Sequence, residues 1–288
     1  MSESKERKVL IIDLANLWVK SLYVCKNSPE DHLKYIINHI RRLYKGKIYS
    51  AIYLVVEGNN NEGKSTYEKY KEGRHKKDGT YDHLRTFISI VCKYVKVVRN
   101  ENAEGDFLVA ELAMYLRNKG DDVTILSNDK DFLQLVQYGI HVAEKTSEGE
   151  ALPLTDEQVL MKFKNSKNVP LDKIENILKY RVFKGDSSDK IPSAVRGMKD
   201  VNIREVINLW EGNDLNEDKL MMIIGKVEDE KVRNGLINNI NNILRNYKLM
   251  NLIGKEFRFL KGSKYLVPKI SKEELERWKV PNNYVIWS

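Results

Sequence analysis

The chain has 288 residues, of which 42% are hydrophobic and 31% are charged, a balance typical of a folded globular protein. Its formal net charge of +8 favours a polyanionic partner such as nucleic acid. We expect a reducing, cytoplasmic setting, because no apolar run could span a bilayer, the start MSESKERK lacks the apolar core of a signal peptide, and the two cysteines are isolated. The five histidines form no zinc-binding motif, which disfavours a catalytic zinc.

The first half of the chain alternates apolar runs with amphipathic segments. Strands are predicted at residues 9–13, 50–57, 96–98 and 122–127. Helices are predicted between them at residues 31–44, about 84–95 and about 106–118. This alternation predicts an α/β fold with a mainly parallel central sheet flanked by helices.

After about residue 150 the strand signals fade, and helical spacing of apolar residues takes over. The spacing is clearest at residues 174–182 and 232–244. We therefore expect a helical C-terminal region that begins between residues 150 and 185.

Acidic side chains occur in short groups, several of which stand where an apolar run stops. Because the carboxyl ends of parallel strands share one edge of a sheet, these acids are expected to converge there. Clustered carboxylates repel each other unless cations neutralise them, and oxygen ligands suit Mg²⁺ or Mn²⁺ rather than zinc. The pattern predicts a Mg²⁺-dependent phosphoryl-transfer enzyme. The candidate acids are Asp13, Glu57, Glu104, Asp106, Asp129, Asp131, Asp186 and Asp189.

Helix capping is a simpler alternative for the paired acids. Asp129 with Asp131, and Glu104 with Asp106, each open a predicted helix, where an acidic residue is common. The segment GDSSDKIP at residues 185–192 could be a solvated loop. Capping needs only one acid of each pair, however, and it does not explain why acids coincide with strand ends.

Residues 64–77, KSTYEKYKEGRHKK, combine basic and aromatic side chains. Basic groups that meet phosphates and rings that stack on bases are typical of a single-strand binding surface. A solvated charged helix is the alternative, but the segment follows the strand that ends at Glu57 and would overhang the acidic edge. The candidate nucleic-acid contacts are Lys64, Tyr67, Lys69, Tyr70, Lys71, Arg74, Lys76 and Lys77.

Residues 58–65, GNNNEGKS, also match the pattern of a phosphate-binding P-loop. A nucleotidase of this type would use Lys64 and Ser65 to hold a nucleoside triphosphate. Glu57 and Glu62 would repel its phosphates, and the pattern leaves most of the candidate acids without a role.

Five segments carry a family resemblance: DLANL at 13–17, YKEGR at 70–74, NAEGD at 102–106, SNDKD at 127–131 and, most specifically, GDSSDKIP at 185–192. With them the chain resembles the 5′-nuclease (flap endonuclease) family, especially the stand-alone 5′-3′ exonucleases of bacteria and bacteriophages and the phage-type RNase H. The resemblance runs from Asp13 to about residue 255.

The resemblance implies two Mg²⁺ sites, in which Mn²⁺ would substitute. The first would use Asp13, Glu57, Glu104, Asp106 and Asp129. The second would use Asp131, Asp186 and Asp189, with Asp129 between the two sites.

The resemblance also implies how DNA is handled. Lys71 and Arg74 would lie at the base of a helical arch and contact the scissile phosphate, so catalytic roles fall to these two residues together with Asp13 and Asp129. A helix–three-turn–helix-like element over residues 186–210 would grip duplex DNA. Its candidate contacts are Lys190, Arg196 and Lys199.

The implied domains are an α/β nuclease domain at 1–165, with the arch at about 60–80, and a helical DNA-binding region at 166–288. The chain departs from the family pattern in four places. Glu57 replaces an aspartate, Phe107 replaces a second acid and is expected to join the core, Lys190 replaces an asparagine, and residues 193–200 lack a glycine-rich hairpin.

The resemblance thus implies a monomeric 5′-nuclease in the cytoplasm of a bacterial or phage-infected cell. It would act near 5′ ends of DNA flaps or on RNA primers paired with DNA, in replication or repair, and leave 5′-phosphates. No membrane partner is expected. A non-catalytic, structure-specific DNA-binding protein is the alternative from a different class.

Overall fold

The computed structural model describes residues 6–25, 29–58, 61–72, 87–88, 90–92, 95–165, 167–253 and 257–265. They form two compact units. The first unit comprises Met1–Asn59, His75–Leu154 and Ile253–Ser288, and the second comprises Asn60–Arg74 and Thr155–Leu252. The chain therefore passes between the units more than once, whereas the sequence suggested one boundary after residue 165.

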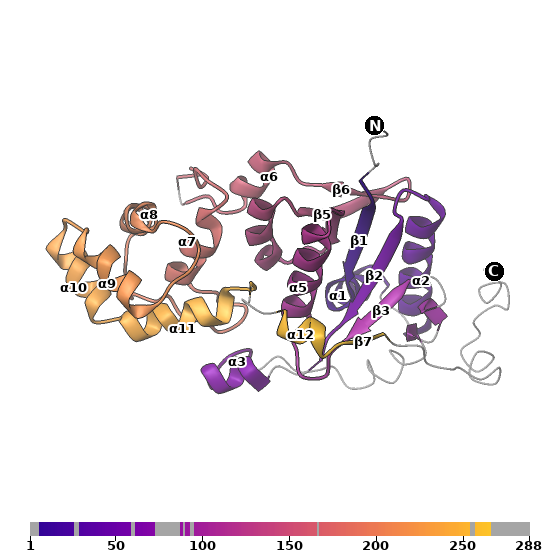
Figure 1. The fold of residues 1–288 in the computed structure, drawn as a ribbon, viewed down its shortest axis with the longest axis horizontal. Helices are drawn as coiled ribbons and strands as arrows, with labels where there is room; N and C mark the ends of the chain where they lie inside the picture. The colour runs from indigo at the N-terminus through magenta and orange to yellow at the C-terminus, as the bar shows by residue number, and fades with distance from the viewer. Residues whose placement is uncertain are drawn as a thin grey trace. The chain divides into compact units, whose positions relative to one another are not determined.

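A mixed, mainly parallel sheet forms the centre of the first unit, with the strand order β6-β5-β4-β1-β2-β3-β7 (Figure 1). Strands β1 to β5 pair in parallel, while β6 and β7 are antiparallel edge strands. This confirms the expected α/β class. The strands are β1 (Lys8–Asp13), β2 (Ala51–Val56), β3 (Lys96–Arg99), β4 (Asp122–Leu126), β5 (His141–Ser147), β6 (Glu150–Pro153) and β7 (Lys264–Tyr265).

Helices cover both faces of the sheet, which is why its central strands are continuous apolar runs rather than alternating ones. Leu10 and Ile12 of β1 belong to a core shared with α1 (Leu14–Val24) and α2 (Pro29–Lys45) on one face. Helix α5 (Gly105–Asn118) contacts β1, β2 and β4 from the other face (Figure 1). A 3₁₀ segment at Lys130–Tyr138, η1, follows β4.

The C-terminal part of the chain returns to this unit through α12 (Arg258–Lys261) and β7, which pairs with β3. The carboxylate of Glu111 in α5 accepts hydrogen bonds from the backbone N–H groups of Phe259 (2.9 Å) and Leu260 (2.8 Å). Phe107 is only half-buried, and its ring packs on that of Phe259 at 5.8 Å between centroids. Phe107 therefore covers the returning segment and does not enter the main core as expected.

The second unit is helical, as the sequence predicted. Its core is apolar and includes Val182, Phe183, Val206, Leu236 and Ile243. Among the described residues, no helix of either unit combines the length and apolar character needed to cross a membrane. The helices are α3 (Asn61–Thr66), α6 (Asp156–Met161), α7 (Asn176–Lys184), α8 (Asp200–Leu209), α9 (Glu217–Gly225), α10 (Glu230–Ile237) and α11 (Ile240–Met250).

Helices α7 and α8 pack together and are joined by a turn at residues 185–199, so a helix–turn–helix arrangement spans residues 176–209. The element predicted at residues 186–210 covers the turn and α8 but not α7. The Tyr180 hydroxyl donates to the Asp200 carboxylate at 2.6 Å and ties the two helices together. The fully buried Asn246 of α11 donates to the carbonyl oxygens of Val182 (3.0 Å) and Pro192 (2.9 Å). The turn is therefore anchored to the helical core.

Candidate active site

Asp13 lies at the carboxyl end of β1 and caps the N-terminus of α1. It is buried, with 5% of its surface exposed. Each carboxylate oxygen accepts a hydrogen bond, Oδ1 from the backbone N–H of Asn16 (3.2 Å) and Oδ2 from the hydroxyl of Ser127 (3.0 Å). Two donors on two oxygens hold the carboxylate in one orientation.

Other acids act on Asp13. Burial is the main reason why the pKa of Asp13 is raised to about 7, and the negative charges of Asp106 and Glu57 raise this pKa further. The hydrogen bonds from Asn16 and Ser127 oppose the rise. The geometry agrees, because Asp13 ends β1 opposite Val55, two residues before Glu57, and Asp106 lies in the first turn of α5.

Glu57 and Glu104 meet this edge from the end of β2 and the start of α5. Glu104 is the N-cap residue of α5 and is buried, yet its side chain makes no capping hydrogen bond. A β-carbon added to Gly105 would lie 3.7 Å from the Cα and Cβ atoms of Glu57, so the helix start and the strand end are in contact. Capping therefore does not explain Glu104.

Asp129 and Asp131 follow β4. The Asp129 carboxylate accepts from the backbone N–H of Asp131 at 2.9 Å and caps η1, so the simpler capping account holds for Asp129. It leaves the half-buried Asp131, in the first turn, unexplained. Within the residues that the structure describes, no three or more His, Cys, Asp or Glu side chains form a group that could hold a metal ion.

Asp186 and Asp189 lie in the turn after α7, in the helical unit. Asp186 accepts from the Arg181 guanidinium (2.8 Å) and from the backbone N–H (2.8 Å) and hydroxyl (2.6 Å) of Ser188. Burial acts to raise the pKa of Asp186, but these hydrogen bonds and the charge of Arg181 outweigh it, so the pKa is lowered. Asp186 is thus held as a carboxylate.

Lys71 is joined to the same turn. Its backbone N–H donates to the carbonyl oxygen of Asp189 at 2.9 Å, and its ammonium group lies 4.0 Å from the Asp189 carboxylate. Both side chains are buried. One predicted catalytic cation and one predicted metal ligand are therefore neighbours within the helical unit.

The basic segment has a buried side and an exposed side. Tyr70 is 3% exposed, which leaves its ring no free face for a base. Tyr67 packs under the guanidinium of Arg245 in α11, at 4.6 Å from the ring centroid. Lys64 and Lys69 are exposed. The predicted contacts Arg74, Lys76 and Lys77 lie outside the described residues.

The turn between α7 and α8 carries the other predicted DNA contacts. Lys190, Arg196 and Lys199 are all exposed. Lys190 has a left-handed backbone with φ of 60°, and an antiparallel bridge between Asp186 and Ile191 closes the tight part of the turn. Exposed cations on an anchored turn suit contact with phosphates.

The packing around Gly58 argues against the P-loop alternative, which needs free backbone N–H groups to cradle phosphates. The N–H of Gly58 donates to the carbonyl oxygen of Ala103 at 3.0 Å. A β-carbon at Gly58 would lie 2.1 Å from the carbonyl oxygen of Asn100. Lys64 lies in the six-residue helix α3, and this helix packs against α11 in the helical unit.

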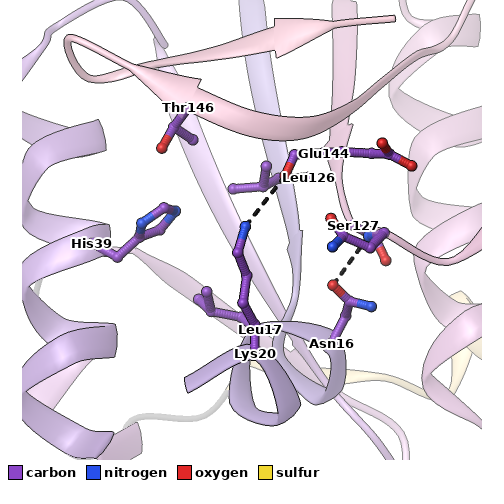
Figure 2. Close-up of a pocket in the computed structure, with 9 residues that line it drawn as sticks. Asn16, Leu17, Lys20, His39, Leu126, Ser127, Glu144 and Thr146 are labelled. Atoms are coloured by element: carbon purple, nitrogen blue, oxygen red, sulfur yellow. Dashed lines mark hydrogen bonds between the residues drawn. The ribbon is translucent and has the colours of Figure 1, made fainter. Parts of the chain in front are cut away.

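Sequence reasoning missed three polar residues that support the acids. Ser127 and Asn16 hold Asp13, and Arg181 pairs with Asp186. Figure 2 shows Asn16 and Ser127 beside a cavity of ≈ 10 Å³, with Lys20 donating to the Glu144 carbonyl oxygen at 3.3 Å. The nearest signal in the sequence is the position of Asn16 and Ser127 inside the motifs DLANL and SNDKD.

Comparison with known proteins identifies the family. A family model for the 5′-3′ exonuclease N-terminal, resolvase-like domain matches residues 8–164. The chain is 24% identical over 261 residues to the 5′-3′ exonuclease of Buchnera aphidicola subsp. Schizaphis graminum, covering 86% of this chain and 84% of that protein. It is 28% identical over 149 residues to the flap endonuclease Xni of Colwellia psychrerythraea, covering 50% of this chain and 47% of that protein.

Solved structures share the fold. The T5 D15 protein, co-crystallised with metal ions, matches with a TM-score of 0.66 and 16% identity over 85% of this chain and 90% of that one. The bacteriophage T5 D15 flap endonuclease in a pseudo-enzyme–product complex with DNA and metal ions matches with a TM-score of 0.64 and 16% identity, over 85% and 89% of the two chains. The resemblance inferred from the sequence motifs is confirmed. Because the family model spans more than half of its 288 residues, the chain belongs to the 5′-3′ exonuclease family.

Proposed function

We propose that this chain is a divalent-metal-dependent 5′-nuclease that hydrolyses phosphodiester bonds near the 5′ ends of DNA flaps or of RNA primers paired with DNA. The observation that carries the proposal is that Asp13 ends β1 opposite Val55, two residues before Glu57, and that the charges of Asp106 and Glu57 act on it, within the part of the chain that the family model matches. Matched relatives are named as a 5′-3′ exonuclease and a flap endonuclease, which supports the reaction.

The acids suit Mg²⁺ or Mn²⁺ in their chemistry. The candidate metal ligands are all carboxylate oxygens. Ionising the buried Asp13 beside other acids costs free energy, and a bound hard cation would offset that cost. We assign Asp13, Glu57, Glu104, Asp106 and Asp129 to one ion, and Asp131, Asp186 and Asp189, with Asp129 shared, to another. When bound, such ions lower the pKa of a water and stabilise charge on the attacking and leaving oxygens.

The chain's own groups would bind and orient the nucleic acid. Lys190, Arg196 and Lys199 would meet the duplex backbone, and Lys64 and Lys69 would meet the single strand; the exposure of all five side chains supports these roles. Lys71 and Arg74 would contact the phosphate that is cleaved, where positive charge stabilises the transition state. Tyr67 and Tyr70 were predicted to stack on bases, but the packing of Tyr70 favours a structural role for that ring.

A non-catalytic DNA-binding protein on the same scaffold is the second candidate. The substitutions Glu57 and Phe107 favour it, as does the lack of a compact group of three metal-binding side chains in the described part of the chain. This candidate predicts tight binding to flap DNA without metal-dependent products.

A single assay separates the candidates. Purified protein is incubated with a 5′-labelled flap substrate and, separately, with a labelled RNA primer on DNA, in Mg²⁺ or in chelator and without nucleotide. The proposal predicts short 5′-phosphate-bearing products in Mg²⁺ only. Binding without products would favour the non-catalytic candidate, and cleavage or tight binding that requires ATP would favour the nucleotidase.

A further inference from the structure

Ser127 is a buried, uncharged residue held from three sides. It follows β4 and is 2% exposed. Its backbone N–H donates to the carbonyl oxygen of Ala143 in β5 at 3.0 Å. Its hydroxyl donates to Asp13 Oδ2 at 3.0 Å and accepts from the backbone N–H of Asp129 at 3.1 Å. One side chain therefore joins the ends of two neighbouring strands.

The direction of these hydrogen bonds is fixed by chemistry. A hydroxyl has one proton to donate and lone pairs to accept with, whereas a backbone N–H can only donate. The Asp129 N–H therefore uses a lone pair of Ser127 Oγ, and the single proton of Ser127 points to Asp13. The hydroxyl orients the Asp13 side chain and the Asp129 backbone at once, and an aliphatic side chain of similar size can do neither.

Asn16 braces the same loop from α1. Its backbone N–H donates to Asp13 Oδ1 at 3.2 Å, and its side-chain oxygen accepts from the backbone N–H of Asn128 at 3.0 Å. In the loop of residues 127–129, the backbone N–H groups of Asn128 and Asp129 thus each donate to a side-chain oxygen, the first to Asn16 and the second to Ser127. Asp13 and Asp129 are held in one arrangement by uncharged groups that are not candidate metal ligands.

We propose that Ser127 is a positioning residue, which couples Asp13 to Asp129 and so presets the carboxylates for metal binding, with Asn16 as its weaker partner. The inference rests on the proposed function, because it concerns the same acids. Groups that orient metal ligands in this way typically change metal affinity or activity by about 10- to 100-fold when removed.

The test compares Ser127→Ala, Ser127→Thr and a matched control, Ser21→Ala. Ser21 is also fully buried, but its hydroxyl donates to the Trp18 carbonyl oxygen at 2.6 Å and lies 3.4 Å from His32 Nδ1, and neither partner is a candidate acid. Mn²⁺ affinity of the DNA-free protein is measured by calorimetry, cleavage of the flap substrate by its kcat and KM, and stability by thermal melting. Ser127→Ala is expected to weaken Mn²⁺ binding and kcat by about 10-fold or more with KM little changed.

Ser127→Thr keeps the hydroxyl and is expected to recover most of the Mn²⁺ affinity, while Ser21→Ala should change stability but leave Mn²⁺ affinity intact. Asn16→Ala serves as a second variant if Ser127→Ala does not fold, and a several-fold loss of Mn²⁺ affinity is expected for it. Wild-type Mn²⁺ affinity in Ser127→Ala or, if that variant is unfolded, in Asn16→Ala would overturn the inference. If the wild-type protein itself neither binds Mn²⁺ nor cleaves, it is the proposed function that fails.

Discussion

The backbone N–H of Lys71 donates to the carbonyl oxygen of Asp189 at 2.9 Å, and the ammonium group of Lys71 lies 4.0 Å from the carboxylate of Asp189. Lys71 has a left-handed backbone, with φ of 51°, and its ammonium also lies 5.0 Å from the centroid of the Tyr70 ring. Lys71, which belongs to the basic segment at residues 64–77, is therefore linked by its backbone and its side chain to the turn between α7 and α8. We expect the lysine and the aspartate to work as a unit.

On the proposed role of Lys71 at the phosphate that is cleaved, Lys71→Ala should lower kcat for flap cleavage by about 100-fold, because the variant lacks the positive charge that would stabilise the transition state. The matched control is Lys248→Ala, since Lys248 is an exposed lysine on α11 of the same unit. Rates for both variants are measured at saturating substrate. A similar loss in the two variants would contradict a specific role for Lys71.

Gly185→Ala should destabilise the helical unit by about 2 kcal/mol or more and reduce cleavage, because the turn that carries Asp186 and Asp189 needs glycine there. Gly185 has φ of 77°, and an added β-carbon would lie 2.6 Å from the carbonyl oxygen of Ile191. Gly197→Ala is the control, since Gly197 has φ of 74° but open space around it. Thermal melting should show a clearly larger loss for Gly185→Ala, and equal losses would refute the close-approach argument.

Asp200→Asn should lower the free energy of unfolding by about 1 kcal/mol near neutral pH, because Asp200 accepts hydrogen bonds from Tyr180 and Arg204. Burial acts to raise the pKa of Asp200, but the bonds from Tyr180 and Arg204 outweigh it and the pKa is lowered. The unfolded chain therefore takes up the proton first on acidification, and the contribution is lost below about pH 4. Urea unfolding at several pH values should show the gap between wild type and variant closing in acid; a gap that widens there would contradict the assignment.

His39→Leu should gain stability relative to the wild type when the pH falls from about 7.5 to 5, because it removes the contribution of His39 to acid destabilisation. His39 is 7% exposed, and burial together with the charges of Arg42 and Lys20 lowers its pKa to about 4. Between about pH 6.5 and this value the unfolded chain binds a proton at His39 that the folded chain does not, so His39 alone lowers the free energy of unfolding of the wild type by about 2 kcal/mol on going to pH 5. The raised pKa of Asp13 acts in the opposite direction but is common to both proteins, so the difference between them isolates His39. Urea unfolding of both proteins at about pH 7.5 and pH 5 measures the difference. An equal change of stability with pH in both proteins would show that His39 is not buried as the neutral form.

The strands and the acids at their ends could be predicted because both leave a pattern in the chain. Apolar runs such as VLII and AIYLVV reveal strands buried on both faces, and Asp13 and Glu57 stand where these runs stop. The two-residue strand β7 and the four-residue α12 are too short to carry a period, so the return of the chain to the sheet was not foreseen.

The supporting residues could not be predicted for a different reason. A serine such as Ser127 or an asparagine such as Asn16 is common in loops, and only the pairing of strands in space shows that each contacts Asp13. The burial of Tyr70 likewise depends on tertiary packing, because the segment around it has too few apolar residues to mark an inner face. The roles assigned to the eight acids stay predictions.

The most direct test of the account is Mg²⁺-dependent cleavage of a 5′-labelled flap by Asp129→Ala and Asp189→Asn, with DNA binding measured in parallel. Asp122→Ala is the matched control, since Asp122 begins β4 at the end opposite to Asp129 and pairs with His141 at 3.5 Å. The account predicts that both test variants lose cleavage while binding DNA within about 3-fold of wild type, and that the control cleaves normally. Mg²⁺-dependent cleavage retained by both test variants would contradict the proposed metal-binding role of these carboxylates.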